Sequence, residues 1–600
     1  MAVTVSGPEL PTAICRRRLT STLGRLDRLD GLPPVHSSLS WFGPAAAAFG
    51  DRATESTIQA RSGLMAVHGW DAGRPQRLGL EVASAAAGVL ASSGTLALLV
   101  GAHRGGQARE VATSVLQGGL LLVAHHLAAA TADRELLPSP PGPEPGPPFC
   151  SADGEWFEIE VFEAEAWRSF WREMGAPDAV LGRAWTAFRS RYYRGICSFP
   201  SGLHQAAARA TLAETVTLAG KWGVSVSRLR SYAEVLAEPG WQGGHLTEIA
   251  AGTGPALPVL AGDSAPLAGI RLVEATNRMQ GPLAGLLLQM LGATVVRVEP
   301  PGGDVGRMVP PSCGDVGSFF RCYNRGKETV ELDLATAAGR DDLRAVLAES
   351  DAFLHNWRPG RAERWGLDAP GLAKTNRRLV YAAASGWGDG PANSEIIGTD
   401  FLVQAYAGFG EGLHPLGEPP RTSRALLTDC MGALVTCEAL LAALLHRART
   451  GHGVAVGPSL LEGAMAAQAH VLDALGGGTA LGDRRSPEGR PIWGPLDRPI
   501  ATDDGYLAVG ADEPADHRRL RQACQVAGEH RSAAADDAIA ARLAEGTAEQ
   551  WDKLLTEAGV PAAAVMTDLA ALAVDDRFSS VVEPLSDTCR APANPWTLTS

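Results

Sequence analysis

Apolar and polar positions follow two spacings along this chain, and the clearest stretch runs from residue 266 to residue 400. Short runs rich in β-branched residues alternate there with segments whose apolar residues recur at helical spacing. Alternating strands and helices predict a doubly wound parallel sheet, which binds ligands at the carboxyl ends of its strands. The predicted strands are 270–275, 294–298, 330–334, 351–355 and 378–384, and the predicted helices include 283–291, 339–349 and 431–445.

A second pattern is an internal repeat, because the segment 59–118 returns 345 residues later without a gap. Composition alone explains two similar Ala/Leu-rich helices, but it does not place glycine and serine residues in the same register. The similarity resumes at two Asp-Gly turns, Asp153-Gly154 and Asp504-Gly505, each of which precedes a strand-like run. The matching positions include Gln59 with Gln404, Gly63 with Gly408, Ser114 with Ser459 and Gly118 with Gly463.

The repeat divides the chain into two unequal copies. Residues 266–400 have no counterpart before residue 50, so the first copy is truncated at its front and we expect it to be non-catalytic. The predicted units are an N-terminal segment (1–50), a degenerate partial copy (51–240), a linker (241–265), a large domain (266–485), a smaller α+β domain (486–585) and a C-terminal tail (586–600).

Composition and charge narrow the class of protein. The 53 basic and 66 acidic residues give a net charge of −13, which argues against a nucleic-acid partner. Nine cysteines are scattered without a C-x-x-C pair, so we expect reduced thiols, no metal site and a cytoplasmic protein. Residues 83–102 form the most lipid-like stretch, and we expect a buried helix there rather than a membrane span.

Eight segments of the second copy, in order, resemble the family III CoA-transferases, the CaiB/BaiF group that includes formyl-CoA transferase and α-methylacyl-CoA racemase. The resemblance implies an α/β fold with a Rossmann-like CoA-binding large domain, and the first copy resembles the middle and end of that fold. Two chains interlock in this family, which implies either an interlocked homodimer or a pseudo-dimer within one chain. The segments include PLAGIRLVEAT (266–276), GPLAGLLLQMLGATVVRVEPPGGD (281–304), HNWRPGRAERWGLD (355–368) and LTDCMGALVTCEALLAALLHRARTGHG (427–453).

The resemblance also implies a carboxylate nucleophile at Asp429, which attacks an acyl-CoA thioester to give a mixed aspartyl anhydride and CoA thiolate. Asp429 directly precedes the apolar run 431–445, so we expect the positive end of a helix dipole to keep it ionised. The alternative is that Asp429 only caps the helix, which is a common role for aspartate. Its counterpart in the first copy is Ser84, which cannot form the anhydride.

The implied partners are an acyl-CoA and a free carboxylic acid, with the CoA thioester as substrate, no separate cofactor, no metal, no nucleic acid and no membrane. Trp357 either stacks on the CoA or packs in the core, and the arginines either bind phosphate or lie on a solvated helix face. The candidate CoA-binding residues are Met279, Gln280, Leu332, Asn356, Trp357, Arg361 and Arg364.

Three functions stay open at this point. The first is a CoA-transferase, the second an acyl-CoA isomerase, racemase or lyase on the same scaffold, and the third a non-catalytic CoA-binding subunit. Thr399 stands where the family usually has Tyr or His, which argues against racemisation because that reaction needs two acid–base groups. We expect the first copy to replace part of a partner subunit and to cover the site that holds Asp429.

Overall fold

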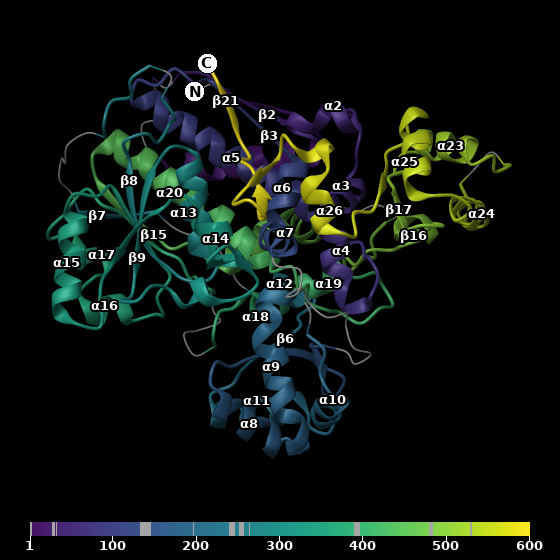
Figure 1. Ribbon diagram of the computed structural model, residues 1–600, viewed down its shortest axis with the longest axis horizontal. Coiled ribbons are helices and arrows are strands. Elements are labelled where there is room, and N and C mark those ends of the chain that lie inside the picture. The colour runs from purple at the N-terminus through teal and green to yellow at the C-terminus, as the bar shows by residue number, and fades with distance from the viewer. Residues whose placement is uncertain are drawn as a thin grey trace.

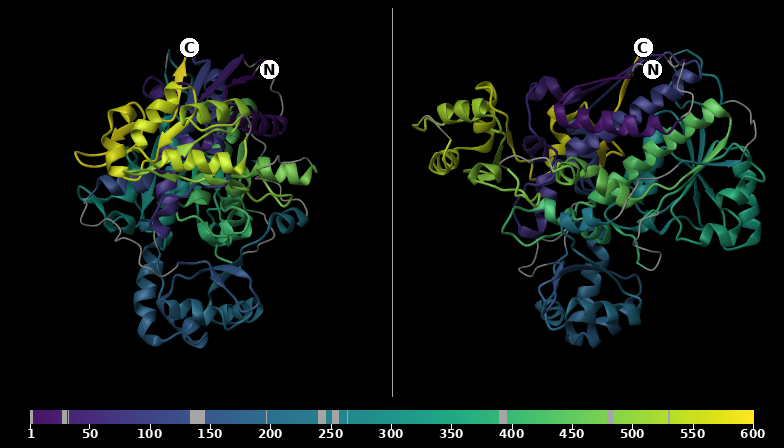
Figure 2. Two further views of the ribbon diagram at one scale, coloured as in Figure 1. Left: turned by 90° about the vertical axis from the view of Figure 1, so that its right-hand side faces the viewer. Right: turned by 180° about the vertical axis from the view of Figure 1, so that it is seen from behind.

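A computed structural model describes residues 3–26, 31, 33–132, 146–195, 197–238, 246–250, 257–262, 264–388, 396–478, 484–528 and 531–600. Two sheets with parallel strands lie in a central body, and two smaller units project from it (Figure 1). The two chain ends lie close together on one side of the molecule (Figure 2).

The larger sheet has seven strands, and only β7 runs antiparallel to its neighbour. One face packs on α13 (Gln280–Met290) and α20 (Leu427–Thr450), and the other face packs on α15 (Ala337–Ala348) and α16 (Arg361–Trp365). This arrangement confirms the predicted mixed α/β fold with a parallel sheet. The strand order is β12 (Glu328–Glu331), β9 (Thr294–Glu299), β8 (Arg271–Ala275), β13 (Ala352–His355), β14 (Val380–Ala383), β15 (Gly453–Val456) and β7 (Thr247–Ala250).

The smaller sheet belongs to the N-terminal part of the chain and has the order β1 (Val3–Ser6), β2 (Val35–Ser40), β3 (Glu110–Ser114) and β21 (Thr597–Thr599). Helix α1 (Glu9–Gly24) lies against α5 (Val82–His103). The predicted boundary at residue 50 falls between β2 and β3, so residues that the sequence leaves without a counterpart belong to the same sheet as the repeated segment.

Five pairs of helices among the described residues begin 345 residues apart, which is the offset that the sequence repeat predicts. The two longest helices, α5 and α20, pack against each other in the centre of the molecule. The other pairs are α3 (Glu55–Arg61) with α18 (Asp400–Tyr406), α4 (Leu64–Gly69) with α19 (Phe409–Leu413), α6 (Val115–Leu122) with α21 (Leu460–Ala467), and α7 (Ala124–Thr131) with α22 (Ala469–Gly476).

Each copy also has a small unit with an antiparallel sheet and its own apolar core. The unit of the first copy, at the bottom of Figure 1, has β4 (Phe149–Cys150), β5 (Trp156–Glu160) and β6 (Ser225–Arg228). The unit of the second copy, at the right, has β16 (Ile500–Ala501), β17 (Tyr506–Val509) and β18 (Ala562–Ala564).

The two copies exchange parts. The sheet of the first small unit contacts α18 of the second copy, and the sheet of the second small unit contacts α3 of the first copy. Strand β7, from the end of the first copy, pairs with β15, whereas β21, from the end of the chain, pairs with β3. The predicted linker 241–265 contains β7, and its residues 241–245, 251–256 and 263 lie outside the described residues.

Two helices, α5 and α20, are long and apolar enough to cross a bilayer by composition alone. Within their most apolar windows, 94% of α5 and 89% of α20 is buried inside the protein. Core helices pass the same test of length and hydropathy, so these two give only weak evidence for a membrane span.

The expectation of reduced thiols is wrong for one pair of cysteines. Cys313 and Cys589 form a disulfide, whereas the other seven cysteines are free. The two partners are 276 residues apart in the sequence, so no local spacing could reveal the pair.

Candidate active site

Asp429 lies in the first turn of α20, where the sequence predicts a helix start. The N-cap residue of α20, Leu426, has a left-handed backbone with φ of 53°. Its counterpart in the first copy, Glu81, is the N-cap residue of α5 and has φ of −84°. A left-handed leucine costs roughly 1–2 kcal/mol, and such strain concentrates at functional sites. Of these two matched helix starts, therefore, only the one that carries Asp429 is strained.

The neighbouring carboxyl group of Asp400 organises this helix start. Its Oδ2 accepts hydrogen bonds from the backbone N–H of Asp429 at 2.9 Å and from the hydroxyl of Thr428 at 2.7 Å. The side-chain amide of Gln404 donates to the other oxygen, and Asp400 is fully buried. Among the described residues, the Asp429 carboxyl group accepts no such bond, so Asp400 is the satisfied member of the pair and Asp429 is the one available for chemistry.

The pKa of Asp429 is raised well above its ordinary value. Burial is the main cause, and the nearby charges of Asp400 and Glu160 act in the same direction, whereas Arg278 opposes them. Burial also raises the pKa of Asp400, against the effect of its hydrogen-bond donors. The sequence suggests the opposite direction, because the helix dipole favours the ionised form, but desolvation outweighs it.

The first copy supplies side chains to the surroundings of Asp429. Glu160, at the end of β5, accepts a hydrogen bond from the hydroxyl of Thr399 at 3.1 Å. The same carboxylate pairs with the guanidinium of Arg191 at 3.0 Å and accepts a short hydrogen bond from the hydroxyl of Tyr192. Glu160 and Arg191 are both buried, so this small unit closes over the start of α18 with its charges compensated.

Arg278 lies in the turn between β8 and α13 and also contacts the first copy. Its guanidinium lies 4.5 Å from the ring centre of Phe162 and 5.4 Å from that of Tyr192, both from the first copy. The preceding residue, Asn277, is fixed by two backbone hydrogen bonds to the side chain of Asn356, at 3.0 and 2.9 Å. Sequence reasoning missed Glu160, Tyr192 and Arg278, because the first two lie more than 230 residues before Asp429 and no repeat position marks the third.

The predicted CoA-binding residues follow the carboxyl ends of strands β8, β12 and β13. Met279 and Gln280 stand at the start of α13 and are buried, and the Gln280 amide lies 3.4 Å from the carbonyl of Ser385. Trp357 stacks on His355, with ring centres 4.6 Å apart, and meets Trp365 edge-on at 5.2 Å. The remaining residues follow the same strand ends: Leu332 is partly buried, Asn356 fixes Asn277, Arg361 lies over Trp365 and Arg364 is exposed.

The counterpart of this site in the first copy is sealed. The hydroxyl of Ser84 donates to Glu55 at 2.6 Å, and the backbone N–H groups of Ala83 and Ser84 donate to the same carboxylate at 2.9 Å. Glu55 is the counterpart of Asp400 but has one more methylene group, which lets it reach the side chain at the helix start. A buried ion pair between Arg61 and Asp552, at 2.8 Å, lies across the interface with the second small unit.

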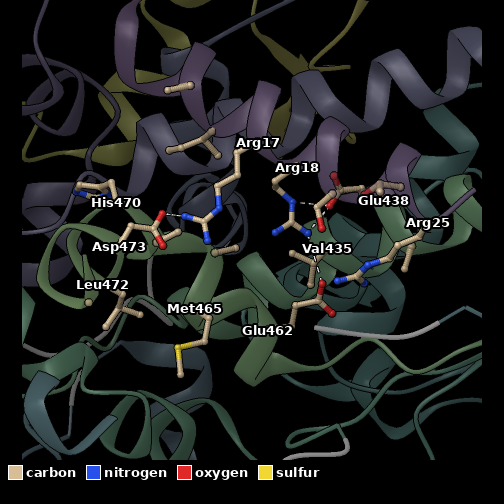
Figure 3. Close-up of a pocket in the computed structure, with 18 of the residues that line it drawn as sticks. Arg17, Arg18, Arg25, Val435, Glu438, Glu462, Met465, His470, Leu472 and Asp473 are labelled. Carbon is tan, nitrogen blue, oxygen red and sulfur yellow. Dashed lines mark hydrogen bonds and ion pairs between the residues drawn. The ribbon is translucent and has the colours of Figure 1, made fainter. Parts of the chain in front are cut away.

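A pocket of about 750 Å³ lies elsewhere, between α1 and the helices α20, α21 and α22 (Figure 3). Arg18 pairs there with Glu438 and Glu462, whereas Arg17 pairs with Asp473. The matching face of the first copy is covered, because the indole of Trp596 donates to the carbonyl of Leu90 at 2.8 Å. Leu90 corresponds to Val435, which lines the pocket. The pocket in the second copy therefore lies at the place that Trp596 covers in the first copy.

These features define an α/β protein with a buried acidic site that two internal copies build together. The chain matches the model of CoA-transferase family III at residues 35–262 and 267–598, and it belongs to that family. The two separate matches are consistent with the predicted repeat.

Named relatives cover about half of this chain each. An acetyl-CoA:oxalate CoA-transferase of Acetobacter aceti is 31% identical over 315 residues, which are 49% of this chain and 79% of the relative. A probable fatty acyl-CoA transferase of Mycobacterium tuberculosis is 31% identical over 326 residues, which are 50% and 82%. A solved CAIB/BAIF family protein from Brucella suis aligns with a TM-score of 0.48 and 24% identity, covering 55% of this chain and 97% of that one.

Proposed function

We propose that the protein transfers CoA from an acyl-CoA thioester to a free carboxylic acid, with Asp429 as the nucleophile. Membership of the CoA-transferase family supports CoA transfer in general, and similar proteins are named for transfer between acetyl-CoA and oxalate or between succinate and glutarate. The observation that carries the assignment to Asp429 is the contrast between two matched helix starts. Among the described residues, only the backbone N–H of Asp429 is hydrogen-bonded and its carboxyl group accepts no hydrogen bond, whereas the Ser84 hydroxyl donates to Glu55.

The proposed reaction begins when an Asp429 oxygen attacks the thioester carbonyl carbon. The carbon–sulfur bond breaks, CoA leaves as thiolate, and an aspartyl–acyl anhydride remains. The acceptor carboxylate then attacks the aspartyl carbonyl carbon and expels the donor acid, which gives a second anhydride. The thiolate finally attacks the acceptor's acyl carbon, so the new acyl-CoA forms and the Asp429 carboxylate returns.

The surroundings of Asp429 support this chemistry in two ways. Burial makes a carboxylate more reactive when it is ionised, because it has lost the water that would stabilise its charge. The positive charge of Arg278 offsets part of that cost, because it acts to lower the pKa of Asp429. The candidate CoA residues at the strand ends would hold the remote part of the thioester, and binding there can position the reacting carbon.

We further propose that each chain holds one active site and that the first copy acts as the partner. Glu160, Tyr192 and Phe162 come from the first small unit and lie against Thr399 and Arg278 of the second copy. The matching location in the first copy has Ser84 and Glu55 in place of Asp429 and Asp400. This arrangement supports an intrachain pseudo-dimer rather than an interlocked homodimer.

Hydroxylamine trapping tests the proposal. The full chain is incubated with an acyl-CoA and hydroxylamine, and we expect mass spectrometry to locate a hydroxamate on Asp429. Asp429→Asn should lose both the adduct and CoA release, whereas Ser84→Ala, the matched change in the first copy, should keep both. Isomerised acyl-CoA without an adduct would support the isomerase, racemase or lyase alternative, and CoA binding without product or adduct would support a non-catalytic subunit.

A further inference from the structure

Two arginines converge on one phenyl ring at the edge of the candidate active site. The guanidinium of Arg278 lies 4.5 Å from the ring centre of Phe162, and the guanidinium of Arg358 lies 5.7 Å from it. Both side chains are exposed, and they come from the loops that follow β8 and β13, whereas Phe162 comes from the first copy. Two elements of the CoA-binding sheet therefore bring like charges together at the interface between the copies.

The contact with the ring of Phe162 positions the two guanidinium groups but leaves their N–H donors without an acceptor. A phenyl face attracts a guanidinium through its quadrupole, but it accepts none of the five N–H groups in the usual sense. Among the described residues, neither Arg278 nor Arg358 makes a side-chain hydrogen bond or ion pair. Two cations that contact the same ring repel each other, and their N–H donors have no acceptor among the described residues, so a bound anion would stabilise the arrangement.

The position of Arg278 indicates which part of a substrate this anion belongs to. Tyr192, 5.4 Å from the guanidinium, donates to Glu160, and Glu160 in turn accepts from Thr399, which directly precedes Asp400. Asp400 holds the backbone of Asp429 at 2.9 Å. Arg278 is thus linked to the reacting carboxyl group through contacts of the first copy, and its positive charge acts to lower the pKa of Asp429. The candidate phosphate-binding residues Arg361 and Arg364 lie on α16 instead.

We propose that Arg278, with Arg358 beside it, binds the second carboxylate of a dicarboxylic acyl group. This inference rests on the proposed CoA transfer at Asp429, because it assumes that the acyl carbon lies there. One carboxyl group of such a substrate forms the thioester, and the other pairs with the guanidinium. Arg278 is a specificity-determining residue in this scheme, and the substrates are short dicarboxylic acids and their CoA thioesters.

The test compares two acyl groups of equal carbon number in the full chain. Succinyl-CoA carries a second carboxylate and butyryl-CoA does not, and release of CoA in the presence of hydroxylamine reports attack by Asp429 without any acceptor acid. We expect wild type to prefer succinyl-CoA. Arg278→Met removes a positive charge near Asp429 and should therefore lower kcat/KM for both thioesters. The loss should be about 10- to 100-fold larger for succinyl-CoA than for butyryl-CoA, the worth of a charge-assisted hydrogen-bonded pair.

Two further variants separate charge from folding. Arg278→Lys keeps the charge but loses the two-pronged geometry, so we expect an intermediate loss for succinyl-CoA. The backbone of residue 278 has φ of 62°, and Lys and Met meet the same strain there as Arg. Arg189→Met is the matched control, because Arg189 is also exposed and stacks on a ring, 5.6 Å from the centre of Trp185, inside the first small unit.

The outcomes distinguish this inference from the proposed function. An equal loss for both thioesters in Arg278→Met would overturn the inference. Weaker binding of CoA alone by Arg278→Met would also overturn it, because either result would point to contact between Arg278 and CoA itself. A wild-type preference for butyryl-CoA would also overturn it. Calorimetry with succinate and with butyrate needs no turnover: succinate binding that Arg278→Met abolishes supports the carboxylate site even where no adduct forms on Asp429, whereas equal binding of the two acids contradicts it.

Discussion

At the scale of single residues, the carboxyl group of Asp429 couples stability to function. Its pKa is raised in the folded protein by burial and by Asp400, so folding favours the protonated form. A raised carboxyl pKa means that the folded state binds more protons than the unfolded state between the two pKa values. The free energy of unfolding therefore falls as the pH rises from about 4, the ordinary aspartate pKa, towards the raised value.

Asp429→Asn should accordingly lose activity and gain stability. We expect a loss of roughly 10³-fold or more in CoA transfer, because the nucleophile is gone. The amide carries no charge, so the variant should unfold at higher urea concentration than wild type at neutral pH, with a gain of about 1.4 kcal/mol for each unit of raised pKa. Urea titrations at pH 4, 6 and 8 measure this gain, which should shrink towards zero at pH 4; a gain that is constant with pH would contradict the assignment.

The matched position in the first copy should respond in the opposite way. Ser84 is buried and donates to Glu55, so Ser84→Asp would place two carboxylates together without a cation beside them. We expect Ser84→Asp to lower the free energy of unfolding by about 3–5 kcal/mol, the range for an uncompensated buried charge, and to create no second active site. Ser84→Ala should cost only about 1–3 kcal/mol for the lost hydrogen bond. A hydroxamate on residue 84 of the aspartate variant would show that the first copy keeps latent activity.

The candidate nucleophile could be predicted from sequence because it occupies a fixed place in a local motif at the start of an apolar helix. Glu160 could not, because its proximity to Asp429 depends on how the first small unit packs against the second copy. Arg278 could not, because it lies in a turn of the second copy that no repeat position or quoted motif marks as part of the site. The raised pKa of Asp429 also escaped prediction, since burial by distant segments decides it rather than the helix that carries it.

At the scale of elements, the most periodic segments match their predictions closely. The predicted strand 294–298 corresponds to β9 (Thr294–Glu299), and the predicted helix 339–349 corresponds to α15 (Ala337–Ala348). Strands β7 and β21 have only four and three residues, too short to carry a period, and both pair across the two copies. The sheet β1–β2–β3 was missed for a related reason: its strands lie on both sides of the boundary that the repeat indicated.

Trp596 tests how the C-terminal segment covers the first copy. Its side chain is 5% exposed and its indole donates to the carbonyl of Leu90 within α5, next to Gly94. We expect Trp596→Ala to lower the free energy of unfolding by about 3–5 kcal/mol, through the lost burial and the cavity left behind. Trp596→Phe keeps most of the ring and should cost about 1–2 kcal/mol less than alanine does. Equal unfolding midpoints in urea for all three proteins would contradict this packing role.

At the scale of the whole molecule, the first copy packs against the second in two places. Helix α5 packs along α20, and the first small unit closes over the start of α18. That residues 50–240 stand in for part of a partner subunit stays a prediction, as do the exact domain boundaries. The repeat could be recognised from register alone, but the exchange of parts between the copies required the folded structure.

Deleting residues 1–240 should therefore leave an insoluble or inactive protein. The fragment 241–600 would expose the apolar face of α20 that α5 covers, and it would lose Glu160 and Phe162 from the site. Sedimentation and CoA-transfer assays measure the outcome, and expression of 1–240 in the same cells should restore soluble, active protein. A monodisperse 241–600 fragment with full activity would refute the supporting role.

The crossed pairing of β7 and β21 indicates that the two halves could be made as separate polypeptides. Each half of the chain ends in a strand that pairs with the sheet of the other half. These two strand pairings hold the halves together even without the peptide that joins them. A split between residues 256 and 266 would leave β7 on the N-terminal polypeptide and β21 on the C-terminal polypeptide. Two separately translated polypeptides should then assemble into a permanent heterodimer. The sequence of one of them could change as long as its exchanged strand and its contact surface are kept.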